Sequence, residues 1–594
     1  MIDNAQHKSP TVDRDSNPKN FLQLELGHEK WISASTLVEI MLKNKIVSQV
    51  IIMILPKGYS YIHVRCKTAD KYKNRYDDHS RVKLDASDGS DYIHANYIDG
   101  YKQTQKYIAT QGPMYNTITD FWSMVWKEKV SKIIMITNVM ENGRCKCEKY
   151  WPDDVASYGD IKLSLEKEES FADFVARTLS ISKDEENREI KQFHFVSWPD
   201  HDVPLNTTPF INFLKRVRSY NSHCCAPIVI HCSAGIGRTG TVILFESAFQ
   251  MGIQENQVDV LGQLCSMRKQ RMNIVENYDQ YIFVYQALVE ALCIGNTSIV
   301  SKNFLKEYSK LIKSNEETGV SMIENQFQML NDFRRQLMPK DIHSAYMITN
   351  QSKNRSMYIL PSDRARPLLG RDSNDSDYIN AVFISSYTKK DACVATQYPL
   401  PETVLDFWRM IFTLKSRIII LLQNIPFSDS ENPRFWPEDG SKHFGRFLVK
   451  FESVIEENDI VITNLCVNDT ESEEQNPPVS IRLLQIKSWP VDCELPTDTL
   501  PILEAGKFIN ACASEFTNNV ITITCLDGVT ACGIFCAFLH ITDQMKVEQE
   551  INIFQSVKCT RTNRTQFITN LEQYTFLFEL IKAYLESMLV TDWI

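Results

Sequence analysis

The sequence predicts an α/β (α+β) fold in two tandem domains, each built on a mixed β-sheet flanked by helices. Three observations support this prediction. The chain has 594 residues, more than one hydrophobic core normally organises. Its second half repeats short blocks of the first half in the same order. Each half also alternates apolar runs rich in β-branched residues with stretches of helical periodicity, which is typical of a sheet that carries helices.

Five pairs of blocks define the repeat. DYIHANYIDGY at 91–101 returns as DYINAVFISSY at 377–387, and ATQGPMYNTITDFW at 109–122 returns as ATQYPLPETVLDFW at 395–408. YWP, SWPD and HCSAG of the first half return as FWP, SWPV and TCLDG about 290 residues later. A period this long indicates tandem domains rather than a solenoid.

The predicted domains span residues 31–295 and 303–588. Residues 1–30 are polar, which predicts a disordered or juxtamembrane-like segment. Residues 296–302 are also polar and are expected to form the linker between the domains. A helical stripe of apolar residues follows the linker and suits the first helix of the second domain.

Local patterns predict the main elements of each domain. Apolar β-rich runs at 132–137 and 417–422 are expected to be strands. Apolar residues at helical spacing predict helices at 119–127 and 404–413, and a further helix near the C-terminus at 566–588.

Composition excludes several classes of function. Hydrophobic residues make up 43% and charged residues 23% of the chain, as in soluble globular proteins. The net charge of -10 argues against broad binding to nucleic acid. Sixteen cysteines without a signal peptide indicate reduced thiols and a cytoplasmic setting. The chain is therefore expected to be cytoplasmic, or the intracellular part of a single-pass membrane receptor whose span lies outside this sequence.

The segment VIHCSAGIGRTGTVILF at 229–245 carries the strongest chemical signal. A strand-like run leads into a glycine-rich turn and then into a predicted helix, so backbone N–H groups and the helix N-terminus converge on one point. Arg238 adds a planar guanidinium suited to two oxygens of an oxyanion. Cys232 lies at the base of this cradle, where the field favours the thiolate, and Thr239 offers a hydroxyl to the sulfur. The pattern predicts a thiolate nucleophile aimed at a bound phosphoryl group.

Other interpretations of these residues are weaker. A buried structural cysteine would leave the glycines, the arginine and their spacing unexplained. A nucleotide-binding phosphate loop requires a lysine before its Ser/Thr, and this loop has an arginine there. Cys145 and Cys147 lack a second cysteine pair at zinc-ligand spacing. No metal and no other cofactor are predicted.

The segment HCSAGIGRTG resembles the signature loop of the protein tyrosine phosphatases that use a cysteine nucleophile. KNRY, DYIHANYIDGY, ATQGP, WPDH and DQYIF follow the order of that family, and the resemblance covers nearly all of residues 70–590. The tandem layout is similar to the intracellular half of receptor-type phosphatases, with details closest to the subfamily of the mu and kappa types. The resemblance implies a highly twisted mixed sheet in each domain and phosphotyrosine proteins as partners.

The resemblance also implies a role for each motif residue. Cys232 would attack phosphorus and form a phosphocysteine, while Asp200 would first protonate the leaving phenol and then activate water. Tyr76 would stack on the substrate ring. The remaining residues would bind phosphate, position water or support the site: His231, Ser233, Ala234, Gly235, Ile236, Gly237, Arg238, Thr239, Glu276, Gln280, Glu141 and Lys146.

The first domain departs from the family pattern at three places. The loop after Tyr76 is short, Asp202 stands where the family usually has glycine, and Glu276 stands where it has glutamine. These departures leave open a catalytically impaired scaffold that binds phosphotyrosine. A dual-specificity phosphatase with a shallower pocket is a third interpretation, and Tyr76 argues against it.

The second domain keeps the fold motifs and loses the chemistry. Cys525 matches Cys232, but Ala531 replaces the loop arginine and Val491 replaces the general acid. Asp527 brings a negative charge into the loop. The domain is therefore expected to be catalytically inactive and to serve as a regulatory or docking partner in intramolecular contact with the first. The sequence leaves dimerisation open.

Overall fold

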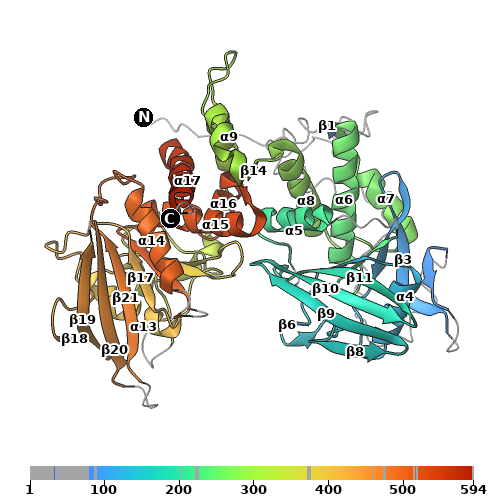
Figure 1. The fold of residues 1–594 in the computed structure, drawn as a ribbon, viewed down its shortest axis with the longest axis horizontal. Helices are drawn as coiled ribbons and strands as arrows, with labels where there is room; N and C mark the ends of the chain where they lie inside the picture. The colour runs from blue at the N-terminus through green and yellow to red at the C-terminus, as the bar shows by residue number, and fades with distance from the viewer. Residues whose placement is uncertain are drawn as a thin grey trace, which may run out of the picture. The chain divides into compact units, whose positions relative to one another are not determined.

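The computed structural model describes residues 32–33, 79–85, 90–200, 202–220, 226–370, 376–457, 459–471, 477–512, 515–516 and 519–591. By contacts, the chain divides into two compact units, residues 1–151, 157–162 and 222–293, and residues 152–156, 163–221 and 294–594. The domain limits 31–295 and 303–588 therefore stay a prediction. The mixed α/β class is confirmed, since two mixed sheets flanked by helices are present (Figure 1).

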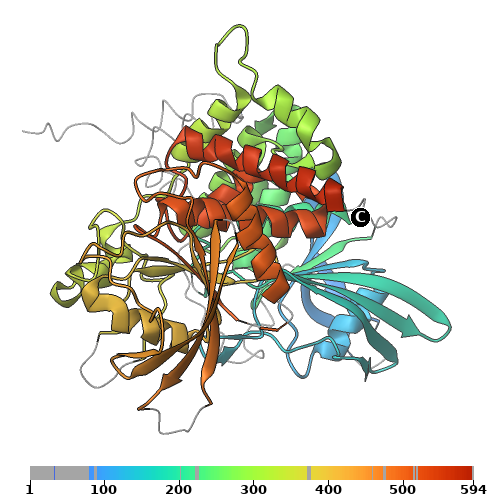
Figure 2. The same cartoon turned by 60° about the vertical axis from the view of Figure 1, so that its left-hand side comes forward.

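The first large sheet contains nine strands in the order β2-β3-β4-β12-β5-β11-β10-β9-β8. Strand β12, the fourth in this order, runs parallel to both neighbours, with Ile230 opposite Ala109 of β4 and Ile134 of β5. The teal strands β10 and β11 form a long antiparallel pair (Figure 2). The strand bounds are β2 Arg81–Lys83, β3 Tyr92–Gly100, β4 Gln103–Thr110, β5 Lys132–Met135, β8 Val155–Tyr158, β9 Ile161–Ser170, β10 Phe174–Lys183, β11 Glu186–Phe195 and β12 Ile228–His231.

The second large sheet contains eight strands in the order β15-β16-β22-β17-β21-β20-β19-β18. Strand β22, which lies between β16 and β17, is also parallel to both neighbours, with Ile523 opposite Ala395 of β16 and Ile420 of β17. β22 therefore holds the place that β12 holds in the first sheet. The bounds are β15 Ala381–Ile384, β16 Cys393–Gln397, β17 Ile418–Leu421, β18 Ser441–Phe444, β19 Phe447–Glu457, β20 Ile460–Asp469, β21 Val479–Ile486 and β22 Ile521–Cys525.

Short paired strands complete the described β-structure. Three two-stranded pairs are present, with β1 Ile32–Ser33 on β13 Gln257–Val258, β6 Met140–Glu141 on β7 Arg144–Cys145, and β14 Ile299–Val300 on β23 Glu550–Ile551.

The predicted helices appear close to their expected bounds. Helix α4 covers Ile118–Lys127 and α13 covers Val404–Thr413, as the apolar spacing predicted. The C-terminal helix α17 begins at Leu571, five residues later than the pattern suggested. The other α-helices are α5 Thr208–Ser219, α6 Gly237–Glu255, α7 Val260–Gln270, α8 Tyr278–Val289, α9 Phe304–Leu311, α10 Met322–Asp332, α11 His343–Tyr346, α12 Ile348–Gln351, α14 Leu500–Cys512, α15 Thr530–Glu548 and α16 Ile553–Arg561.

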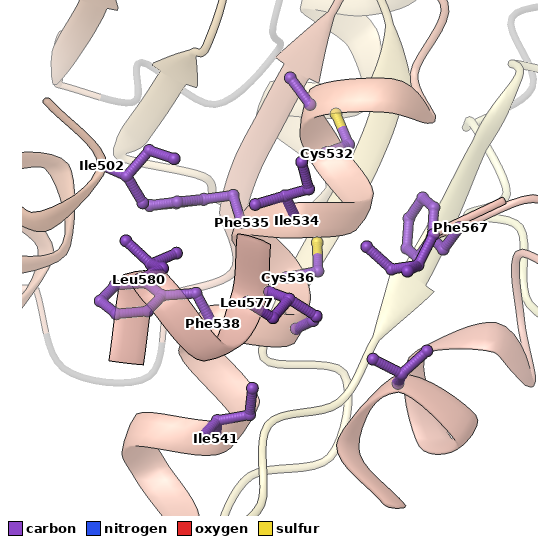
Figure 3. Close-up of a cluster of buried hydrophobic side chains, with 14 of the residues drawn as sticks. Ile502, Cys532, Ile534, Phe535, Cys536, Phe538, Ile541, Phe567, Leu577 and Leu580 are labelled. Atoms are coloured by element: carbon purple, nitrogen blue, oxygen red, sulfur yellow. The ribbon is translucent and has the colours of Figure 1, made fainter. Parts of the chain in front are cut away.

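Helices α6 and α15 follow strands β12 and β22 and are buried along most of their length. A helix that is apolar on every side is stable only inside a core. Figure 3 shows Phe535 and Phe538 of α15 packed with Leu577 and Leu580 of α17. Each such buried side chain contributes about 1.5–3 kcal/mol relative to exposure. The core thus holds α15 in place behind the loop that precedes it.

Within the described residues, we find no helix that combines the length and the apolar character needed to cross a membrane.

Candidate active site

The phosphate-cradle loop joins β12 to α6. Strand β12 ends at His231 and α6 begins at Gly237, so the turn between them contains only five residues. Gly235 has φ +68°, and a Cβ there would lie 2.1 Å from the backbone oxygen of Thr110. Only glycine fits a position that combines a left-handed backbone with this close approach. The glycine predicted from the motif therefore sets the shape of the loop.

Arg271 holds the carbonyl groups of this loop. Its Nε donates to Gly235 O at 2.7 Å and its Nη2 to Ala234 O at 3.2 Å, while Nη1 donates to Asn96 Oδ1 at 2.6 Å. The C=O and N–H groups of a trans peptide point in opposite directions. Anchoring the carbonyls on Arg271 therefore turns the N–H groups that follow them away from this residue. Sequence reasoning missed Arg271, although the second repeat keeps an arginine, Arg564, at the corresponding position.

Arg238 forms a two-pronged ion pair with Glu141. Nη1 donates to Oε1 at 2.6 Å and Nη2 to Oε2 at 2.9 Å, and the two side chains are only 12% and 5% exposed. Such fork-to-fork geometry fixes the plane of the guanidinium. The structure thus brings together the predicted oxyanion-binding arginine and its predicted supporting carboxylate.

Glu141 is itself held by its surroundings. Oε1 also accepts from Thr137 Oγ1 at 3.1 Å and from the backbone N–H of Asn138 at 3.0 Å. The ammonium of Lys146 lies 3.9 Å from Oε2. A buried carboxylate is stable only with such partners, and here they leave it one orientation, directed at Arg238.

His231 and Thr239 lie beneath the loop. His231 is fully buried, with Nε2 2.8 Å from the hydroxyl of Tyr150 and Nδ1 3.2 Å from Cys232 O. Burial lowers the pKa of His231 from 6.5 to about 4, so the ring is neutral at pH 7. Cys232 is 5% exposed. Thr239 Oγ1 is buried and has no hydrogen-bond partner among the described residues, so its bond to the sulfur stays a prediction.

Glu276 and Gln280 flank the start of α6. A Cβ placed on Gly237 would lie 2.7 Å from Gln280 Nε2 and 2.9 Å from Glu276 Oε2. Gln280 Oε1 accepts from the backbone N–H of Glu276 at 3.0 Å, and Asn277 caps helix α8 by accepting from Gln280 N. Both side chains therefore border the end of the cradle loop at Gly237, and their role in binding substrate or positioning water stays a prediction. The carboxylate of Glu276 puts a negative charge where the family pattern has a neutral amide.

The predicted general acid lies on a separate segment. Asp200 is half-buried, two residues after Trp198, whose indole N–H donates to Asp202 O at 2.8 Å. Trp198 is 2% exposed and anchors this turn. The proposed ring-stacking Tyr76 and its KNRY motif lie outside the described residues.

The second repeat preserves the loop and not its charges. Cys525 is fully buried at the end of β22, and Ala531 is fully buried where the first repeat has Arg238. Val491, at the position of Asp200, packs against an apolar cluster. A valine cannot carry a proton to a leaving group.

In one of two similar sheets, a glycine-rich loop surrounds a cysteine and is followed by an arginine paired with a carboxylate. These features define a class of enzymes that act on phosphate esters. The chain belongs to the protein-tyrosine phosphatase family, whose profile matches residues 69–290 and 350–583. The two matched regions confirm the tandem organisation predicted from the repeat.

Similar proteins are receptor-type phosphatases. The chain is 36% identical over 536 residues to receptor-type tyrosine-protein phosphatase U of Gallus gallus, covering 88% of this chain and 37% of that protein. It is 34% identical over 539 residues to receptor-type tyrosine-protein phosphatase alpha of Homo sapiens, covering 88% of this chain and 66% of that protein. Receptor-type tyrosine-protein phosphatase S of Gallus gallus is 35% identical over 533 residues, covering 87% of this chain and 35% of that protein. The chain thus spans between about a third and two thirds of the length of these relatives.

Proposed function

We propose that the first domain hydrolyses phosphotyrosine on proteins through a phosphocysteine intermediate at Cys232. The observation that supports this most is the ion pair between Arg238 and Glu141, which presents a fixed guanidinium six residues from the cysteine. Preorganised donors of this kind stabilise the charge that develops on a transferring phosphoryl group. Asp200 would protonate the leaving phenol and then activate water. In this proposal the second domain is inactive and regulates or docks partners.

We further propose that the chain is the intracellular part of a membrane receptor, as the receptor-type relatives suggest by their names. Phosphotyrosine proteins are its proposed partners, together with intramolecular contact between the two domains.

A catalytically impaired scaffold that binds phosphotyrosine is the second candidate. Glu276 favours it, because its carboxylate borders the cradle at Gly237 and would repel a phosphocysteine or an approaching hydroxide. In this case attack would proceed and hydrolysis of the intermediate would be slow.

Turnover of p-nitrophenyl phosphate by the whole chain, beside a Cys232→Ser control, separates the two candidates. Steady release of p-nitrophenol that the control lacks supports the enzyme. A burst of one equivalent followed by no release supports the scaffold, and Glu276→Gln should then restore steady turnover. Equal rates in the chain and the control would remove the phosphocysteine from the mechanism.

A further inference from the structure

The two cradle loops have similar backbone geometry at two matched positions. Gly235 has φ +68° and Gly528 has φ +71°. A Cβ on Gly528 would lie 2.4 Å from the backbone nitrogen of Gln397, which matches the close approach of Gly235 to the neighbouring strand. The residue before each helix is also alike, with φ -124° and ψ -69° at Ile236 and φ -134° and ψ -58° at Val529. The second repeat therefore retains the shape of an anion cradle.

In the second repeat, the carboxylate of Asp527 occupies this cradle. Oδ1 accepts from the backbone N–H groups of Val529 at 2.8 Å and Thr530 at 2.9 Å. Oδ2 accepts from the Thr530 hydroxyl at 2.6 Å. The thiol of Cys525 donates to Oδ1 at 3.2 Å. The carboxylate thus accepts hydrogen bonds from the donors at the start of α15 and from the thiol of Cys525. These are the groups that would otherwise contact an incoming oxyanion.

The first repeat has Ala234 at the position of Asp527. A methyl group accepts no hydrogen bond, so the first cradle has no internal ligand of this kind. The difference between the two loops at this position is one carboxylate.

A buried cation beside the second cradle supports the same interpretation. Arg564 is fully buried, and among the described residues only its Nη1 has a hydrogen-bond partner, Asn380 Oδ1 at 2.9 Å. Burial lowers the pKa of Arg564, and the charge of Asp527 is among the groups that oppose this lowering. A nearby negative charge stabilises a buried guanidinium. The Asp527 carboxylate contributes to that charge, and an oxyanion in its place would do the same.

We propose that the second cradle is a tetrahedral-oxyanion site closed by the chain's own Asp527 carboxylate, and that removing this carboxylate opens it. The native second repeat then does not bind phosphotyrosine, and its docking function uses other surfaces. The inference concerns the second repeat and stands whether or not the first domain turns over substrate.

Titration calorimetry of the whole chain with tungstate tests this proposal, and the number of sites is the readout. Asp527→Ala should bind one tungstate more than the wild-type chain. Its affinity should be at least tenfold below that of the first cradle, because Ala531 provides no guanidinium. Ala234→Asp installs the same carboxylate in the first cradle and should remove the tungstate that the wild-type chain binds there.

Asp498→Ala is the matched control, since Asp498 Oδ1 accepts from Leu500 N at the start of α14 without a glycine cradle. This variant should bind the same number of tungstate ions as the wild type. Asp527→Ser keeps a capping oxygen at the start of α15 and provides a folded alternative if the alanine variant unfolds. An unchanged number of sites in folded Asp527→Ala or Asp527→Ser overturns the proposal, and undiminished binding by Ala234→Asp does so independently. Failure of the wild-type chain to bind tungstate at the first cradle would count against the proposed phosphatase and not against this inference.

Discussion

Replacing Glu141 with glutamine removes one negative charge from beneath Arg238 while keeping the length of the side chain. In the native structure, both carboxylate oxygens accept from the guanidinium, at 2.6 and 2.9 Å, and Thr137 and Asn138 hold the same carboxylate. A glutamine amide offers one acceptor oxygen and turns an N–H₂ donor toward a guanidinium that carries only donors. The variant therefore keeps one contact of the fork and replaces the other with a repulsive contact between two donors.

The expected cost follows from burial. The side chains of Arg238 and Glu141 are 12% and 5% exposed, so solvent compensates little for the lost contact. Breaking a buried ion pair by removing one charge costs about 3–5 kcal/mol. Since the glutamine oxygen retains one contact, we expect the free energy of unfolding to fall by about 2–3 kcal/mol. A displaced guanidinium should lower kcat/KM by about 10²-fold, just below the loss expected when a preorganised donor is deleted.

Urea unfolding and p-nitrophenyl phosphate kinetics on the whole chain measure both effects. Met140→Ala is the control, since Met140 is the neighbouring residue and its side chain is 55% exposed. The control should change neither quantity appreciably. Wild-type kcat/KM together with an unchanged unfolding midpoint in Glu141→Gln would refute the claim that this carboxylate positions Arg238.

Three further predictions concern backbone shape, pH and helix capping. Gly235→Ala should lower the free energy of unfolding by about 3 kcal/mol or more, because its Cβ would meet Thr110 O at 2.1 Å. Gly143→Ala, with φ +72° and no neighbour within 4 Å, should cost only about 1 kcal/mol, and equal costs in urea unfolding would contradict this reasoning. The pKa of His231 is about 4 in the folded chain, against an ordinary value of 6.5 that applies to the unfolded chain. Between pH 4 and pH 6.5, therefore, mainly the unfolded state binds the proton. The free energy of unfolding should then fall by about 3 kcal/mol from this group as pH drops from 7 to 4, and a His231→Asn chain should lose less over the same range. Gln549 ends α15 at φ +55°, and Gln549→Gly should raise stability by about 1 kcal/mol in thermal unfolding; a lower melting temperature would speak against backbone strain at this cap.

Local patterns were sufficient to predict the strand that leads into the site and helices elsewhere in the chain. The run of β-branched residues before Cys232 became β12, and helix α13 has the predicted bounds 404–413. These elements are predictable because their burial follows a short-range period that the sequence displays directly. The predicted start of α17 at residue 566 is too early. The helix begins at Leu571, because the residues just before it form a turn. Residue 568 in that turn has a positive φ, which no apolar periodicity reveals.

Contacts between distant segments were less predictable. Arg271 lies 36 residues from the carbonyl of Gly235 that it binds, and its own segment contains no feature that points to the loop. Only the presence of Arg564 in the second repeat distinguished it from an ordinary surface arginine. Asp527 was predicted to bring charge into the second loop, but its contacts with two backbone N–H groups and the thiol depend on a loop shape that sequence alone does not specify.

The comparison of the two repeats separates what the fold requires from what the chemistry requires. Loop shape depends on a glycine at positive φ beside a neighbouring strand, and both Gly235 and Gly528 meet that requirement. Ala531 and Val491 stand where the first repeat has Arg238 and Asp200, and the glycine geometry is retained beside them because neither position supports it. The fold can therefore persist after the charges are lost, and an empty cradle then exposes converging N–H groups with no ligand. A carboxylate such as Asp527 satisfies those donors from within the chain, so closure of the second cradle stabilises the start of α15 in a repeat that has no guanidinium to bind an oxyanion.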